Sequence, residues 1–125
     1  MKIFLDTADT ETIRKYFETG LVDGVTTNPS LIMKAGRLPD DVYQEIKDIG
    51  VPDISMEVMG DANEMYNEGL RLVDKFGSVA TIKVPCTREG LKTCKALTEE
   101  KIRTNVTLIF CASQAVLAAK AGATY

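Results

Sequence analysis

The sequence predicts an α/β fold built on a parallel β-sheet, and two observations support this prediction. Segments of strand character alternate with segments of helical periodicity five times along the 125 residues, as consecutive parallel strands require. The turn after the first expected strand, Asp6-Thr7-Ala8-Asp9, has no glycine, whereas an open doubly wound sheet typically binds a nucleotide through a glycine-rich turn there. The pattern therefore favours a (β/α)8 TIM barrel, with the open sheet as the alternative.

The expected elements follow from apolar periodicity. Strands are expected at residues 2–6, 24–27, 54–58, 79–84 and 103–110, with the start of a sixth at residues 124–125. Helical segments are expected at residues 10–19, 29–33, 39–49, 62–76, 88–99 and 112–121.

Caps and breakers place the ends of these elements. Asp9 caps the first helix and Gly20 ends it, because a short carboxylate satisfies free helical N–H groups and glycine adopts the left-handed conformation. Pro29 and Pro39 suit the first turns of the next two helices, and Asp61 caps the fourth. No linker, repeat or low-complexity tract interrupts the series, so we expect a single domain over residues 1–125.

Composition narrows the function classes. The net charge is −3 and the basic residues are scattered, so we expect no nucleic-acid partner. The N-terminal apolar run is far shorter than a signal-peptide core, and no segment approaches the ~20 apolar residues that span a bilayer, so we expect a cytoplasmic protein with no membrane partner. Cys86, Cys94 and Cys111 show no C-x-x-C spacing, and we expect reduced thiols that act as small hydrophobes.

The chain contains no histidine, which restricts its chemistry. The commonest transition-metal ligand is missing, and so is the base of every Ser-His or Cys-His pair. Any acid–base catalysis must therefore use carboxylates, lysine, tyrosine or water. We expect neither a metal nor a cofactor.

Polar residues occupy the C-terminal ends of all five expected strands. Because side chains alternate along a strand, residues two apart face the same way, and in a β/α barrel these ends surround one cavity. Lys83 is the most informative, because burial of an ammonium lowers its pKa and a neutral lysine is a nucleophile for carbonyl carbon. The residues on this face are Asp6, Thr26, Asn28, Ser55, Glu57, Thr81, Lys83, Asn105 and Thr107.

Each of these residues also has a structural interpretation. Lys83 could extend its ammonium to water at the strand end, and Glu57 could be a solvated charge. Asp6 and Asn28 could be cap or turn residues, and Thr107 suits a strand on propensity alone. The joint pattern, a lysine with two carboxylates and several neutral polar groups on one face, favours a catalytic site.

Three internal segments and the N-terminus resemble the transaldolase family, and more narrowly its short bacterial and phage-type branch. The resemblance extends over the whole chain in the same order. The matching segments are Met1-Lys2-Ile3-Phe4-Leu5-Asp6-Thr7-Ala8, Thr26-Thr27-Asn28-Pro29-Ser30-Leu31-Ile32, Ile82-Lys83-Val84-Pro85 with Glu89-Gly90-Leu91, and Asn105-Val106-Thr107-Leu108-Ile109-Phe110 with Ser113-Gln114-Ala115.

This resemblance implies a (β/α)8 barrel enzyme that moves a dihydroxyacetone unit between sugar phosphates of the pentose phosphate pathway. Lys83 matches the Schiff-base lysine, and Asp6 matches the residue that takes the proton from the C4 hydroxyl. Glu57 and Thr107 match the pair that holds a water for proton transfer. Asn28 and Asn105 match residues that bind hydroxyls of the three-carbon unit, and Thr26 and Ser55 are further candidates for substrate binding.

Two positions distinguish the branches of the family. Fructose 6-phosphate aldolases, the alternative function, resemble this chain but have glutamine at the position of Glu57 and tyrosine at that of Phe110. A glutamate exchanges protons and a phenylalanine cannot supply one. Both residues favour transaldolase.

The chain is short for a complete barrel. Eight β/α units commonly need ~250 residues, so we expect only the N-terminal part, five β/α units and the start of strand six. The implied phosphate-binding serine and arginine would lie beyond Tyr125. Open sheet edges favour association, so we expect a homo-oligomer. An inactive scaffold or assembly module is the alternative from another functional class.

Overall fold

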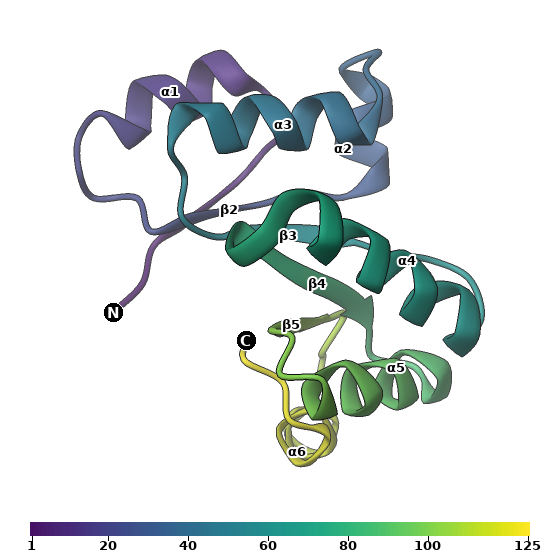
Figure 1. Cartoon of the computed structure of the whole chain (residues 1–125). Coiled ribbons are helices and arrows are strands. Elements are labelled where there is room, and N and C mark those ends of the chain that lie inside the picture. Colours follow the sequence, from purple (N-terminus) through teal and green to yellow (C-terminus); the bar gives the residue numbers. More distant parts are fainter. The chain divides into compact units, whose positions relative to one another are not determined.

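The computed structural model describes all residues, 1–125, and they form two compact units (Figure 1). The first comprises residues 1–56 and 76–80, and the second comprises residues 57–75 and 81–125. Strands and helices alternate along the chain and the strand pairs are parallel. The predicted α/β class is confirmed, and the five β/α units are those of the N-terminal part of a TIM barrel. The prediction of a single domain stays a prediction.

The first unit contains three parallel strands in the order β1-β2-β3. Its elements are β1 (Phe4–Asp6), α1 (Thr10–Phe17), β2 (Gly24–Thr26), α2 (Pro29–Lys34), α3 (Pro39–Ile49) and most of β3 (Ile54–Glu57). Asp6 lies opposite Thr26 in the register, and Thr26 lies opposite Ser55. These three predicted site residues therefore form one row across the strands.

The predicted caps of the first unit are present. The Asp9 carboxylate accepts a hydrogen bond from the Glu11 N–H at the start of α1, and the Asn28 side-chain oxygen accepts one from the Leu31 N–H at the start of α2. Helices α1 and α2 both contact α3. Tyr43 of α3 and Phe76 make an edge-to-face contact with ring centroids 5.7 Å apart, a favoured aromatic arrangement.

A polar cluster links α1 to α3 in this unit. The Thr10 hydroxyl donates a hydrogen bond to the Glu45 carboxylate (2.8 Å), and the Arg37 guanidinium forms an ion pair with its other oxygen at 2.5 Å. The Thr10 hydrogen bond, followed by the Arg37 interaction, holds the pKa of Glu45 below its ordinary value.

The second unit contains the end of β3 and two further parallel strands. Its elements are α4 (Ala62–Phe76), β4 (Ala80–Pro85), α5 (Arg88–Glu99), β5 (Thr104–Thr107) and α6 (Ala112–Ala121). Phe76 at the end of α4 and Ala80 at the start of β4 are assigned to the first unit. Lys83 lies opposite Asn105 in the β4–β5 register. The Val58 N–H donates to the Lys83 carbonyl (3.0 Å), so the chain just after β3 is fixed beside β4.

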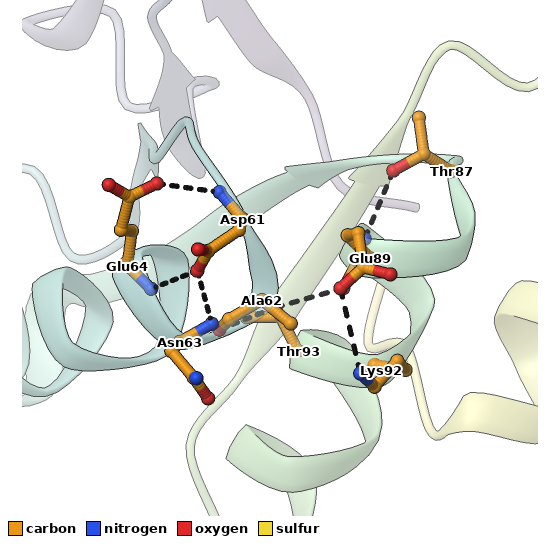
Figure 2. Close-up of polar contacts among 9 residues, drawn as sticks. Asp61, Ala62, Asn63, Glu64, Thr87, Glu89, Lys92 and Thr93 are labelled. Atoms are coloured by element: carbon orange, nitrogen blue, oxygen red, sulfur yellow. Dashed lines mark hydrogen bonds and ion pairs between the residues drawn. The ribbon is translucent and has the colours of Figure 1, made fainter.

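The first turns of α4 and α5 are capped and joined (Figure 2). Asp61 accepts hydrogen bonds from the Glu64 and Asn63 N–H groups, while the Glu64 carboxylate accepts from the Asp61 N–H, a reciprocal capping box. The Thr93 hydroxyl of α5 donates to the Ala62 carbonyl of α4 at 3.2 Å. These bonds fix the two helices that flank β4 in sequence.

Several predicted boundaries were wrong by a few residues. The last strand ends at Thr107 rather than at residue 110, because Leu108 has a φ of 64°, which no strand accommodates. A 3₁₀ turn, η1 (Gly77–Val79), delays the start of β4 to Ala80. Thr124 and Tyr125 are not assigned to a strand, but Thr124 donates to the Thr104 carbonyl and Tyr125 accepts from the Val106 N–H. They therefore pair with β5 as the start of a sixth strand would.

The cysteine prediction was partly wrong. All three thiols are free and Cys94 is buried, as expected of small hydrophobes, but Cys111 is exposed at the N-cap position of α6. A hydrogen bond with the Ser113 hydroxyl, together with the Gln114 backbone, lowers the pKa of the Cys111 thiol. No helix has the length and apolarity needed to cross a membrane.

Candidate active site

Lys83 lies in β4 among buried neighbours. It is 8% exposed, and Thr81, two residues earlier on the same face, is fully buried. Ile82 and Val84, which alternate with them, are fully buried as well, so both faces of β4 are covered. This burial argues against the alternative in which Lys83 extends its ammonium into water.

Glu57 supplies the counter-charge. Its carboxylate oxygen Oε2 lies 3.3 Å from Lys83 Nζ, and the two side chains are only 15% and 10% exposed. The backbone bond from Val58 to Lys83 holds the end of β3 beside β4 and brings the pair together. Glu57 is thus a partly buried partner of Lys83 rather than a fully solvated charge, and its carboxylate can accept a proton from the lysine.

Two further predicted residues lie on β5. Asn105 is directly opposite Lys83, and Thr107 is opposite Pro85, two residues further along. The Thr107 carbonyl accepts a hydrogen bond from the Cys86 N–H (2.8 Å), which extends the β4–β5 pairing past Pro85. Lys83, Glu57, Asn105 and Thr107 thus belong to one unit.

The remaining predicted residues belong to the other unit. The Thr26 hydroxyl donates a hydrogen bond of 2.9 Å to the Asp6 carboxylate, and Ser55 is fully buried in the same row. Asp6 is itself exposed. Thr26 therefore orients the carboxylate that was predicted to act as a base.

Comparison with known proteins decides the family. The sequence profile of the transaldolase/fructose-6-phosphate aldolase family matches residues 3–125. The chain belongs to this family. It is 56% identical over 126 aligned positions to a probable transaldolase of Geobacter sulfurreducens, 56% to one of Herpetosiphon aurantiacus and 51% to one of Nitrosopumilus maritimus. The whole chain is covered in each case, against 58%, 57% and 56% of the relatives, so it spans less than two thirds of their length.

Asn28 has a structural role in this member of the transaldolase/fructose-6-phosphate aldolase family. Its side-chain oxygen caps α2, as the turn interpretation predicted, which leaves its amide nitrogen as the group that could donate to a ligand. The predicted role in substrate binding stays a prediction. No group of three or more histidine, cysteine, aspartate or glutamate side chains is arranged to hold a metal ion.

Gly90 is a residue whose structural role the sequence analysis did not assign. A Cβ at this position would lie 1.9 Å from the Pro85 carbonyl oxygen, so only glycine allows α5 to begin so close to the end of β4. The sequence signal for this role of Gly90 is a glycine in the first turn of an expected helix, where glycine is otherwise unfavourable. Pro85 follows Lys83 by two residues, so Gly90 fixes the strand end that carries the lysine.

Proposed function

We propose that this chain carries the Schiff-base chemistry of a transaldolase, which transfers a dihydroxyacetone unit between sugar phosphates. The observation that carries the proposal is the buried ion pair of Lys83 with Glu57 at 3.3 Å. A lysine enclosed in a strand and paired with one carboxylate has both the nucleophile and the proton acceptor that imine formation needs. Membership of the transaldolase/fructose-6-phosphate aldolase family supports the same chemistry.

The proposed reaction begins with transfer of the Lys83 ammonium proton to Glu57. The free amine attacks the ketone carbon of fructose 6-phosphate or sedoheptulose 7-phosphate, and the carbinolamine loses its hydroxyl as water once that oxygen is protonated. The resulting iminium accepts electrons as the C3–C4 bond breaks. Asp6, oriented by Thr26, is proposed to take the C4 hydroxyl proton, and the three-carbon unit stays on Lys83 until an aldose accepts it.

The other predicted residues receive binding roles in this proposal. Asn105, opposite Lys83, and the Asn28 amide nitrogen would bind hydroxyls of the three-carbon unit, while Thr107 would hold a water together with Glu57. Thr26 and Ser55 would add hydroxyl contacts on their own strands. Sugar phosphates as substrates, a homo-oligomeric state and a cytoplasmic location belong to the proposal too.

Two residues support transaldolase over the fructose 6-phosphate aldolase alternative. Glu57 forms an ion pair with Lys83, which the glutamine expected of the aldolases could not form. Phe110 is 82% exposed and carries no phenolic proton. The proposed enzyme would therefore retain dihydroxyacetone rather than release it.

Borohydride trapping tests the proposal. Incubation with fructose 6-phosphate followed by reduction should add a three-carbon unit to Lys83, which peptide mapping by mass spectrometry would locate. Lys83→Met should abolish the adduct, whereas Lys101→Met, at an exposed lysine, should leave it unchanged. A folded chain that gives no adduct at Lys83 would support the inactive scaffold instead. Turnover that requires erythrose 4-phosphate would identify a transaldolase, and turnover without an acceptor would identify an aldolase.

A further inference from the structure

Two residues other than glycine have a left-handed backbone, and different causes explain them. Lys101 has a φ of 61° and Leu108 has a φ of 64°. A residue with a side chain is disfavoured at such a φ, because its Cβ lies too close to the following carbonyl oxygen. A left-handed residue of this kind therefore needs a reason, either in the local structure or in function.

The end of α5 accounts for Lys101. The Lys101 N–H donates to the Thr98 carbonyl at 2.9 Å, and the Ile102 N–H donates to the Leu97 carbonyl at 3.0 Å. These two bonds form the Schellman arrangement, in which a left-handed residue just after a helix satisfies the last free carbonyl groups. The backbone strain at Lys101 thus terminates a helix.

No helix end accounts for Leu108, which directly follows β5. Val106, two positions earlier, is only 5% exposed, and an extended continuation of β5 would place Leu108 on the same face. Leu108 is instead 56% exposed. The residue therefore carries two costs, a disfavoured backbone conformation and an apolar side chain that remains in contact with water.

This strained residue adjoins the candidate site. Leu108 comes directly after Thr107, one of the proposed site residues. The Thr107 carbonyl accepts a hydrogen bond from the Cys86 N–H at 2.8 Å, which holds the end of β5 to the chain that follows β4. The Gln114 side chain accepts one from the Phe110 N–H at 2.8 Å, which ties the turn after Leu108 to α6. The chain on both sides of Leu108 is thus fixed, and this surrounding structure can hold its φ positive.

A side chain at this position restricts the backbone more than glycine would. Glycine occupies a wide range of conformations at positive φ, whereas a residue with a Cβ has only the small left-handed region there. Because the flanking bonds hold φ positive, Leu108 is confined to that small region. Leucine therefore costs stability at this position but fixes the end of β5 more precisely.

We propose that Leu108 is a positioning residue for the Schiff-base reaction. Its left-handed backbone fixes Thr107 so that the Thr107 hydroxyl and Glu57 together hold the water that transfers protons. This inference rests on the proposed function, and it deepens it: Leu108 acts through Thr107 and needs no contact with the reacting atoms. The strain is worth retaining, because a displacement of about 1 Å at such a group can lower a rate by about 10²-fold.

Leu108→Gly tests the proposal, with Lys101→Gly as the matched control, since both substitutions remove the same kind of strain. Both variants should stay folded with a urea midpoint close to that of the wild type, because relief of the strain offsets the greater freedom of glycine in the unfolded chain. Only Leu108→Gly should slow formation of the borohydride-trapped adduct at Lys83, by about tenfold or more at saturating fructose 6-phosphate. The substrate concentration that gives half the maximal rate should not change, because the positioned water serves proton transfer rather than binding.

Leu108→Asn separates the role of the backbone from that of the side chain. Asparagine has a side chain of similar shape to leucine and adopts the left-handed conformation more readily than most residues, so this variant should react at the wild-type rate. A rate as low as that of Leu108→Gly would assign the effect to the apolar side chain and overturn the proposal. An unchanged rate in Leu108→Gly would overturn it as well. Absence of the adduct in a folded wild type would refute the proposed function and this inference with it, whereas a normal wild-type adduct confines any failure to the role of Leu108.

Discussion

Gly90→Ala is predicted to destabilise the chain, although alanine is normally the better helix former. Gly90 lies in the first turn of α5 and its N–H donates to the Thr87 hydroxyl that caps the helix (3.0 Å). An added Cβ would lie 1.9 Å from the Pro85 carbonyl oxygen and 3.0 Å from the Pro85 carbonyl carbon. Both atoms belong to the backbone, so no side-chain rotation relieves the overlap.

The magnitude follows from two opposing effects. Replacing a helical glycine by alanine gains about 1 kcal/mol of conformational free energy. Against this, the Cβ must move from 1.9 Å to at least 3.0 Å from Pro85, which requires displacement of α5 or of the end of β4. Overpacking of this kind costs about 1 to 3 kcal/mol and occasionally more, and this overlap lies at the severe end because the backbone must shift. We expect a net loss of about 2 kcal/mol.

Urea unfolding followed by circular dichroism measures this loss, with Gly69→Ala as the matched control. Gly69 also lies in a helix, α4, but its added Cβ would meet only side-chain atoms of Leu97 and Ile82 at 3.3 to 3.4 Å. These can adjust, so we expect Gly69→Ala to change stability by less than about 1 kcal/mol. If Gly90→Ala is as stable as the wild type at an unchanged m-value, the argument from close packing is refuted.

Three further predictions concern other parts of the chain. The pKa of Glu45 is lowered in the folded chain. The stabilising effect of its carboxylate is therefore fully present above the pKa of an unfolded glutamate and is lost as the pH falls through the folded value. Thr10→Val should make the free energy of unfolding fall less steeply in acid, as measured by unfolding at a series of pH values. Asn28→Ala should cost about 1 kcal/mol through loss of the α2 cap, whereas Asn28→Asp should keep the stability and lose activity, measured by unfolding and by turnover. Glu57→Gln should retain the fold but slow borohydride-trapped adduct formation at Lys83 by about 10²-fold or more, and unchanged kinetics would remove Glu57 from the proposed mechanism.

Much of the fold followed from the sequence because caps and helical breakers act locally. Asp9, Asn28 and Asp61 cap the helices they precede, and Pro29 and Pro39 begin helices where their fixed φ is suited. These features depend on neighbouring residues alone. The same holds for the alternation that grouped the polar residues at the strand ends.

The features that escaped prediction depend on contacts between distant residues or on single dihedral angles. No local sequence pattern predicts the positive φ of Leu108, which ends β5 earlier than expected. The ion pair of Glu57 with Lys83 joins residues 26 positions apart in sequence and depends on how their strands lie beside one another. Strand alternation predicts which face of the strand each residue occupies, but not which residue it contacts. The exposure of Cys111 likewise depends on what covers the start of α6.

The buried ion pair is better explained by chemistry than by stability. Taking an ammonium and a carboxylate out of water costs several kcal/mol each, and their attraction only partly offsets this cost, so apolar residues of similar size are often as stable or more so in such a place. The residues next to Lys83 and Glu57 in sequence are buried and apolar: Ile82, Val84 and Met56. Apolar side chains are therefore the usual choice at buried positions of these strands. A lysine kept in a buried strand beside one proton acceptor therefore supports the proposed reaction of Lys83 with a carbonyl, which the trapping experiment examines directly.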